Sequence, residues 1–237
     1  MEHPYTWMYA LGIPEKWTHV ATSVFVMAVI LLLAGTARSA MMTAEEHGIV
    51  PDGGLTPRNF FEIIAGFIRD LAEAIIGHHS ESYVPLMSSF FLFILVCNAM
   101  GLFPGFAPPT SNFNITLALG VVSFLAFNYW GFKAQGTAYL KHFMGPIWWL
   151  AVLMVPLEVI GAFVRPFSLG LRLFGNLFGD HLVLEIFTDL TKVAIPVVFY
   201  MLGTLVTVIQ AFVFTLLSII YVALAVSHEH EGEADLL

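Results

Sequence analysis

Apolar residues occur along this chain in five long runs, which charged residues interrupt only at isolated positions. A bilayer core of about 30 Å is crossed by about 20 mostly apolar helical residues, so each run predicts a membrane-crossing helical region. The first three regions are predicted at about 20–37, 83–103 and 114–132. The last two, 147–190 and 193–226, are longer than an upright helix requires, which predicts two long tilted helices.

The segment from about 58 to 76 follows a different pattern, in which apolar and charged positions alternate with helical spacing. Its apolar positions are Phe60, Phe61, Ile64, Phe67, Ile68, Leu71 and Ile75. This pattern predicts an amphipathic helix that lies on the membrane surface. Thr56 followed by Pro57 is typical of a helix start. The alternative is a helix that packs on a soluble partner.

The predicted fold class is an all-α polytopic membrane protein, with about five membrane-crossing regions and one amphipathic surface helix. The whole chain, 1–237, is expected to form a single membrane domain, because it contains no internal repeat. Gln210 has no polar neighbour within a turn, so it is expected to find a partner on another helix, with Arg172 or Asn176 as candidates. That pairing predicts an antiparallel helical hairpin over about 147–226.

The composition supports the membrane assignment. Hydrophobic residues make up 58% of the chain and charged residues only 11%, whereas a soluble domain has about 45–50% and about 25%. The mean hydropathy is +0.83. The single cysteine, Cys97, excludes an internal disulfide and a multi-cysteine metal site. We expect no cofactor, no metal site and no nucleic-acid partner.

Lysines and arginines in the predicted loops set an orientation, because cytoplasmic loops of membrane proteins are enriched in these residues. If 147–190 crosses once, one side carries Arg38, Arg58, Arg69, Lys133 and Lys141, and the other carries Lys16 and Lys192. This distribution places the N-terminus outside and the C-terminal tail in the cytoplasm. Two upright spans divided at Pro166 would place the tail outside. Pro166 fits a kink, or the first turn of a new helix, better than an exposed loop.

Ionisable side chains inside a bilayer are costly, so each is a candidate for function. In the last two apolar runs these are Glu158, Arg165, Arg172, Asp180, His181 and Glu185. At about 100° per residue, one helix face carries Arg172 together with small and polar residues. The other members of this face are Arg165, Ser168, Asn176 and Gly179. No acid lies on this face within one turn of Arg172.

Arg172 sits in the middle of an apolar run, and an arginine at the bilayer centre costs about 2.5–3.5 kcal/mol. A guanidinium stays protonated and cannot relay protons, but it lowers the pKa of a neighbouring carboxyl and so drives its proton off. Ser168 and Gly179 leave room for another helix to approach. The missing acid is therefore expected on that other helix. Snorkelling, or pairing with Glu158 or Asp180 of the same chain, is the alternative.

The opposite helix face carries His181 and Glu185, and Asp180 projects between the two faces. Histidine and carboxyl groups titrate within reach of physiological pH once they are perturbed, so both suit an aqueous proton path. A hydrogen bond between helices accounts for Glu185 equally well.

Three stretches of this sequence resemble subunit a of the F-type ATP synthase membrane sector. They are SLGLRLFGN followed by GDH, IQAFVFTLLSIIYVALA, and FPGFAPPTSNFNITLALG. The resemblance covers nearly the whole chain in the same order, with the amphipathic segment in the matching place. It implies two steeply tilted helices that curve around a rotating ring of small subunits, the c-ring, in which each subunit carries a carboxylate.

The resemblance also implies roles for individual residues. Arg172 matches the family's essential arginine, which displaces the proton from an arriving ring carboxylate and blocks leakage between two offset half-channels. Asn176 and Gln210 match positions near that arginine. Glu158 and Ser168 match positions of the cytoplasmic half-channel.

Asp180 and His181 match positions of the outer half-channel. Some family members carry an acid or a histidine seven residues before the glutamine of the last helix, where this chain has Gly203. The ionisable group of the outer half-channel must then come from Asp180, His181 or Glu185.

The function implied is that of the stator proton-channel subunit of the Fo sector, which couples proton flow to ATP synthesis. The chain has no Walker-type phosphate loop, so it is expected to carry no catalytic site of its own. The implied partners are the c-ring, the peripheral-stalk b subunits, other Fo and F1 subunits and the lipid bilayer of a bacterial plasma (inner) membrane. The alternative is a stand-alone secondary ion or anion transporter, which predicts inverted repeats that the sequence does not show.

Overall fold

The computed structural model of the chain describes residues 7–44, 54, 56–77, 80–103, 105–136, 151–190 and 194–226. Within these ranges the regular secondary structure is entirely helical. Four of the described helices are long and apolar enough to cross a membrane, and a fifth apolar helix is shorter. The prediction of an all-α polytopic membrane protein with about five crossing regions is confirmed.

The helices follow the apolar runs of the sequence. Those that match the five runs are α2 (Glu15–Ala44), α4 (Val84–Met100), α5 (Phe113–Gln135), α7 (Ala151–Leu190) and α8 (Ala194–Val226). The remaining elements are α1 (Trp7–Ala10), α3 (Pro57–Ile76) and two 3-10 turns, η1 (Ser80–Ser82) and η2 (Pro109–Ser111). The helix α2 extends beyond the predicted range of 20–37 at both ends.

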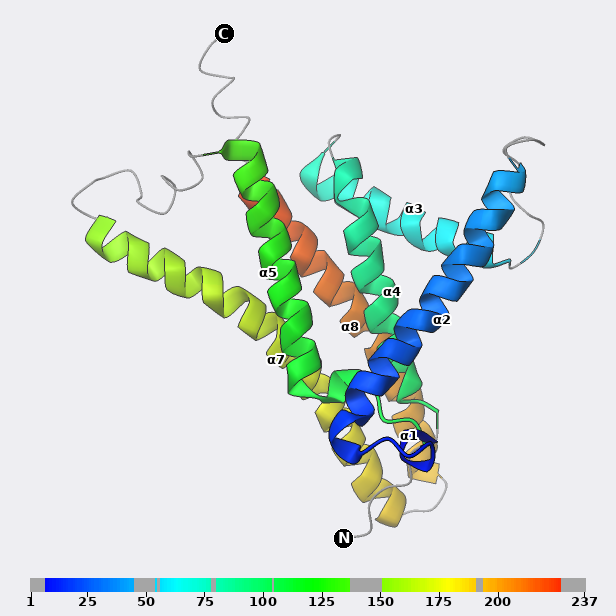
Figure 1. Cartoon of the computed structure of the whole chain (residues 1–237). Coiled ribbons are helices and arrows are strands. Elements are labelled where there is room, and N and C mark those ends of the chain that lie inside the picture. Colours follow the sequence, from blue (N-terminus) through cyan, green and yellow to red (C-terminus); the bar gives the residue numbers. More distant parts are fainter. Residues whose placement is uncertain are drawn as a thin grey trace.

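The predicted surface helix is α3, and local contacts at both ends explain its bounds. The Thr56 side chain accepts a hydrogen bond from the backbone N–H of Asn59 at 3.4 Å, and Pro57 occupies the first helical position. Gly77, at φ 94°, ends the helix and donates its N–H to the carbonyl of Glu73. Figure 1 shows α3 lying across the upper ends of α2 and α4, at the end of the molecule where α8 finishes.

One charged residue of α3 departs from the expected amphipathic pattern. Arg58 is only 7% exposed, although the charged face was expected to meet water. Its Nε donates to Glu62 Oε1 at 2.8 Å, one helical turn further along. An ion pair at this spacing lets the guanidinium lie against the bundle while keeping a partner for its charge.

The helices α4, α5, α7 and α8 pack around one apolar core, to which α3 contributes from the side. Ile94, Leu173 and Phe214, from three of these helices, are fully buried in it. Ile68 of α3 is equally buried, so the surface helix is packed onto the membrane helices rather than being separate from them.

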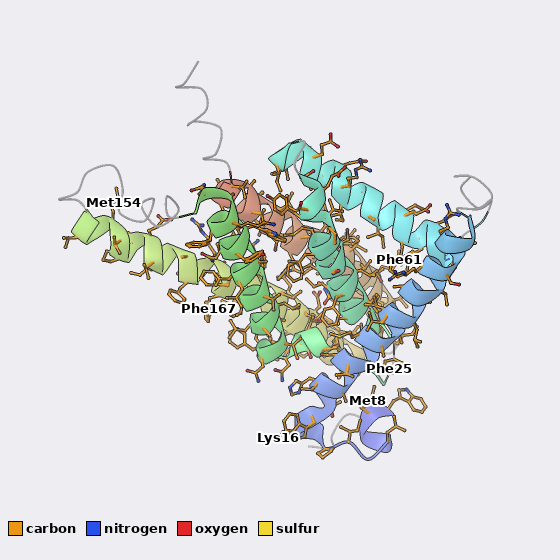
Figure 2. The ribbon with its side chains drawn as sticks, turned by 45° about the horizontal axis from the view of Figure 1, so that its top comes forward. Met8, Lys16, Phe25, Phe61, Met154 and Phe167 are labelled. Atoms are coloured by element: carbon orange, nitrogen blue, oxygen red, sulfur yellow. The ribbon has the colours of Figure 1, made fainter. Side chains whose placement is uncertain are left out.

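The helix α7 is continuous and passes through both Pro156 and Pro166. The suggestion that Pro166 occupies the first turn of a new helix is therefore wrong, and a single long element replaces the two upright spans. At 1.5 Å per residue, its 40 residues extend about 60 Å, twice the thickness of a bilayer core. The helix must therefore tilt, and Figure 1 shows it inclined away from α5, with its N-terminal part leaving the bundle. Met154 marks that part in Figure 2.

Two glycines allow α5 and α7 to cross at close range. A Cβ atom on Gly120 would lie 2.4 Å from the backbone oxygen of Pro166, and one on Gly170 would lie 2.8 Å from the backbone oxygen of Thr116. Small residues at a crossing let two membrane helices bring their backbones together. This crossing fixes the position of the middle of α7, directly before Arg172.

We expect Gly120→Ala to lower the thermal stability of the assembled protein, because the added methyl group collides with backbone atoms that cannot move aside. Overpacking of this kind costs about 1–3 kcal/mol. Gly161→Ala on α7 is the matched control, since a Cβ there meets no atom within 4 Å and alanine favours the helix by about 1 kcal/mol. The thermal midpoint in detergent should fall for Gly120→Ala and hold or rise for Gly161→Ala. Equal midpoints for the two variants would contradict the close crossing.

Candidate functional site

The two C-terminal helices, α7 and α8, form an antiparallel pair. The sequence predicts this arrangement from Gln210, which needs a polar partner on another helix. Arg165 lies over the ring of Tyr221 at 5.7 Å, and the rings of Phe187 and Phe199 stack at 4.8 Å. Between these contacts, the Asn176 side-chain amide donates to Gln210 Oε1 at 2.8 Å. Each step forward along α7 is matched by an equal step backward along α8, so one register holds over all three contacts.

Arg172 lies on the exposed side of this helix pair. Its side chain is exposed, whereas its neighbour Leu173 is fully buried in the core. Among the residues that the structure describes, Arg172 takes part in no salt bridge. The position therefore presents a permanent positive charge that faces outward from the chain.

The other arginine of α7 has a partner within the chain. Arg165 Nη2 lies 3.7 Å from Glu158 Oε1, and both side chains are partly exposed. Glu158 was one of two acids considered as a partner for Arg172, and in the structure it lies beside Arg165 instead. The Tyr221 ring adds a cation–π contact. Two partners within the chain therefore hold the Arg165 side chain in place.

The hydrogen bond between Asn176 and Gln210 confirms that Gln210 finds its partner across the helix pair. Gln210 is 4% exposed and Asn176 is exposed. The buried amide of Gln210 thus fixes the orientation of an exposed amide one turn after Arg172. Ser168, one turn before Arg172, is also exposed. The polar face predicted from the sequence therefore lies on the accessible side of α7.

An open groove of about 380 Å³ lies between α7 and α8, directly after Arg172 along α7. We call it the seam groove, and it is lined by Gly175, Asn176, Gly179, Asp180, Val206, Ile209 and Gln210. Two glycines leave it open, and Asn176, Asp180 and Gln210 give it polar groups among apolar neighbours. It can accept a side chain from a neighbouring helix, together with water.

A second and smaller cavity, of about 30 Å³, lies behind the seam groove, between α4, α7 and α8. We call it the Asn98 cavity, and it is lined by Asn98, Gly101, Leu102, Leu177, Asp180, Leu184, Phe199, Tyr200, Gly203 and Thr207. Asp180 lines both the Asn98 cavity and the seam groove. Asp180 is half-buried in the helix pair, and it is the residue that the linings of the two spaces have in common.

Two of the residues expected in the proton path cannot be placed as side chains. His181 and Glu185 belong to α7, but their side chains lie outside the described part of the structure. Gly203 lines the Asn98 cavity, where a Cβ would meet only Leu102, at 3.9 Å.

Asn98 is a polar residue that the sequence argument did not single out. It lies in the second apolar run, in VCNAMG, and in the structure it is 1% exposed. The available signal was the same one that identified Gln210, an amide within an apolar helix. Such an amide needs a partner from another element, and Thr110 supplies one by donating its hydroxyl to Asn98 Oδ1 at 2.7 Å.

Comparison with known proteins gives consistent results along nearly the whole chain. The family model described as ATP synthase A chain matches residues 20–223. The chain is 43% identical to ATP synthase subunit a of Bdellovibrio bacteriovorus, over 92% of this chain and 96% of that protein. It is 42% identical to ATP synthase subunit a of Geobacter sulfurreducens, over 93% of each chain. With ATP synthase subunit a of Geotalea uraniireducens the identity is 41%, over 97% of this chain and all of the relative.

Proposed function

The chain belongs to the ATP synthase A chain family, and from this membership we propose that it is the stator subunit that conducts protons through the membrane sector of a bacterial ATP synthase. In this role it exchanges protons with carboxylates on a rotating ring of neighbouring subunits. It performs no ATP chemistry itself, which takes place in other subunits of the complex.

One observation carries the proposal: Arg172 is exposed on the outer side of the α7–α8 pair and has no salt bridge among the described residues. Two other polar side chains on the same helix face have partners within the chain, Glu158 for Arg165 and Gln210 for Asn176. A charge in a membrane-crossing helix that has no partner there needs an acid from outside the chain. A ring carboxylate is that acid.

Arg172 acts on the ring carboxyl as a fixed positive charge. When a protonated ring carboxyl reaches it, the guanidinium stabilises the carboxylate form and lowers the pKa of the carboxyl, so that the proton leaves. The carboxylate stays near Arg172 until it is protonated again on the other side of the stator. Because arginine does not give up its own proton, it also prevents protons from passing directly between the two half-channels.

The two half-channels lie on different parts of α7 and are offset along it. Glu158 and Ser168 precede Arg172 and line the cytoplasmic half-channel, which takes the proton released from the ring carboxyl. Asp180 and His181 follow Arg172 and line the outer half-channel, with Glu185 a further turn along. Asp180 has the position that such a role requires, since it lines the seam groove on one side and the Asn98 cavity on the other.

The proposed orientation has the N-terminus outside and the C-terminal tail in the cytoplasm. In support, the ends of α2 and α5 that carry Arg38 and Lys133 lie at the same end of the molecule as α3 (Figure 1). Lys16 lies at the opposite end (Figure 2). The peripheral-stalk b subunits and the remaining Fo and F1 subunits complete the complex around this chain.

Reconstitution tests this function against that of a stand-alone transporter. We expect liposomes containing the chain alone to show no proton or anion flux under a membrane potential. Liposomes containing the whole membrane sector should conduct protons, and a carbodiimide that modifies the ring carboxyl should stop the flux. Flux through the isolated chain that is insensitive to the carbodiimide would contradict the proposal and favour the transporter.

A further inference from the structure

The side chain of Asn98 is buried, and its amide N–H₂ group makes no hydrogen bond to the described residues. Its Oδ1 accepts from Thr110, and its Nδ2 has no hydrogen-bond partner among the described residues. A buried amide N–H without a partner is costly, so such a group is normally satisfied by an ordered water or a ligand. The hydrogen bond from Thr110 fixes the amide plane and leaves the N–H₂ group for that second partner.

The space beside Asn98 has the size and the chemistry of a water site. The Asn98 cavity of about 30 Å³ has room for one or two waters, since one water needs about 10–15 Å³ of such volume. A buried water also needs polar partners, and Asn98, Asp180 and Thr207 are among the residues that line the cavity. The residues that line this small space thus include both a hydrogen-bond donor, the Asn98 amide, and an acceptor, the Asp180 carboxyl group.

We propose that Asn98 positions a water that hands protons to Asp180, and that the Asn98 cavity is the last aqueous station of the outer half-channel. This inference rests on the proposed function. The Asn98 amide donates Nδ2–H to the water oxygen, which orients the water to donate toward the Asp180 carboxylate. A proton arriving from the outer side passes through that water to Asp180, and from there into the seam groove beside Asn176 and Gln210.

The site explains how the chain works without an ionisable group at position 203. Gly203 leaves its share of the wall empty, and a Cβ there would meet only Leu102 at 3.9 Å. The water occupies the space that a side chain at position 203 would fill. The cavity lies at the end of α4 and near the start of α8, which is the end of the molecule where α1 lies (Figure 1). In the proposed orientation that end faces the outer side.

Asn98→Leu tests the inference, because leucine resembles asparagine in size and cannot hold the water. We expect passive proton conduction by the whole membrane sector to fall about tenfold, in line with the loss of one buried hydrogen bond. The remaining conduction should depend more steeply than that of the unmodified chain on the pH of the outer side. Its dependence on the pH of the inner side should be unchanged. Ser89→Leu, on the exposed side of α4, is the matched control and should conduct normally. Normal conduction by Asn98→Leu, or an equal change in both pH dependences, would overturn the inference.

A second variant covers the case in which Asn98→Leu does not assemble. Asn98→Cys in a Cys97→Ala background should keep measurable proton conduction, because the small thiol leaves room for the water, and should lose it when silver ions are added from the outer side. The unmodified chain provides the comparison, since Cys97 is fully buried and should not respond to silver. A conducting Asn98→Cys complex that is unaffected by silver would refute a hydrated cavity at this residue.

Parallel measurement of Arg172→Ala separates the inference from the proposed function. If Arg172→Ala keeps coupled pumping, the proposed function is wrong, and the inference that rests on it is wrong as well. If Arg172→Ala is uncoupled while Asn98→Leu conducts normally and Asn98→Cys resists silver, only the inference fails.

Discussion

ATP-driven proton pumping should fall to background when Arg172 is replaced by alanine in the whole complex. At about 4 Å and an effective dielectric constant of about 20, two unit charges interact by about 4 kcal/mol. That energy corresponds to about three pKa units of the ring carboxyl. Without it the carboxyl keeps its proton as it passes the stator, so rotation moves no protons. Pumping in inverted membrane vesicles, followed with a pH-sensitive dye, measures the effect.

ATP hydrolysis by the soluble sector should continue in these Arg172→Ala vesicles, but without coupling to proton movement. Arg165→Ala is the matched control, since Arg165 already has Glu158 and Tyr221 as partners, and it should lose less pumping than Arg172→Ala. Coupled pumping by Arg172→Ala at the normal rate would refute the assigned role.

Asn176→Asp should be nearly as damaging, although it changes the side chain by only one group. Asn176 lies one helical turn after Arg172, so the new carboxylate would pair with the guanidinium within the chain. A permanent partner of this kind competes with the ring carboxylate for Arg172, by an energy of the same order, about 4 kcal/mol. We expect at least about a tenfold loss of coupled pumping in the same vesicle assay.

Asn176→Leu separates the new charge from the lost hydrogen bond. It removes the amide that donates to Gln210 without adding an acid, and a single hydrogen bond contributes about 1 kcal/mol. The leucine variant should therefore keep most of the pumping that the aspartate variant loses. If the two variants lose pumping equally, the hydrogen bond rather than the absence of an acid is what matters at this position.

Much of the fold follows from sequence pattern because membrane helices depend on local composition. The lengths of the apolar runs correctly indicated α7 and α8 as elements too long to stand upright, and Thr56 with Pro57 marked the start of α3. The partner of Gln210 could also be predicted, since a buried amide must find another polar group and only a few were within reach. The need of a buried amide for a polar partner can be recognised before any tertiary contact is known.

Features that depend on which helix neighbours which were not predictable in the same way. Nothing in the sequence pairs Gly120 with Pro166 or Arg165 with Tyr221, because both contacts are made between different helices and result from their final packing. The burial of Arg58 depends likewise on α3 resting against the bundle. Asn98 carries the same signal as Gln210, an amide in an apolar run, but only the structure shows that its Oδ1 accepts from Thr110 while its Nδ2 has no partner among the described residues.

The central claim is that the partner of Arg172 is carried by a different chain, and crosslinking measures this most directly. Arg172→Cys, in a Cys97→Ala background and paired with a cysteine beside the ring carboxylate, should form a disulfide between the two subunits under mild oxidation. Leu173→Cys is the control, since Leu173 is fully buried and should give no such product. The account predicts a crosslinked pair for position 172 alone. No crosslink at 172 under any oxidising condition, or equal crosslinking at 172 and 173, would contradict it.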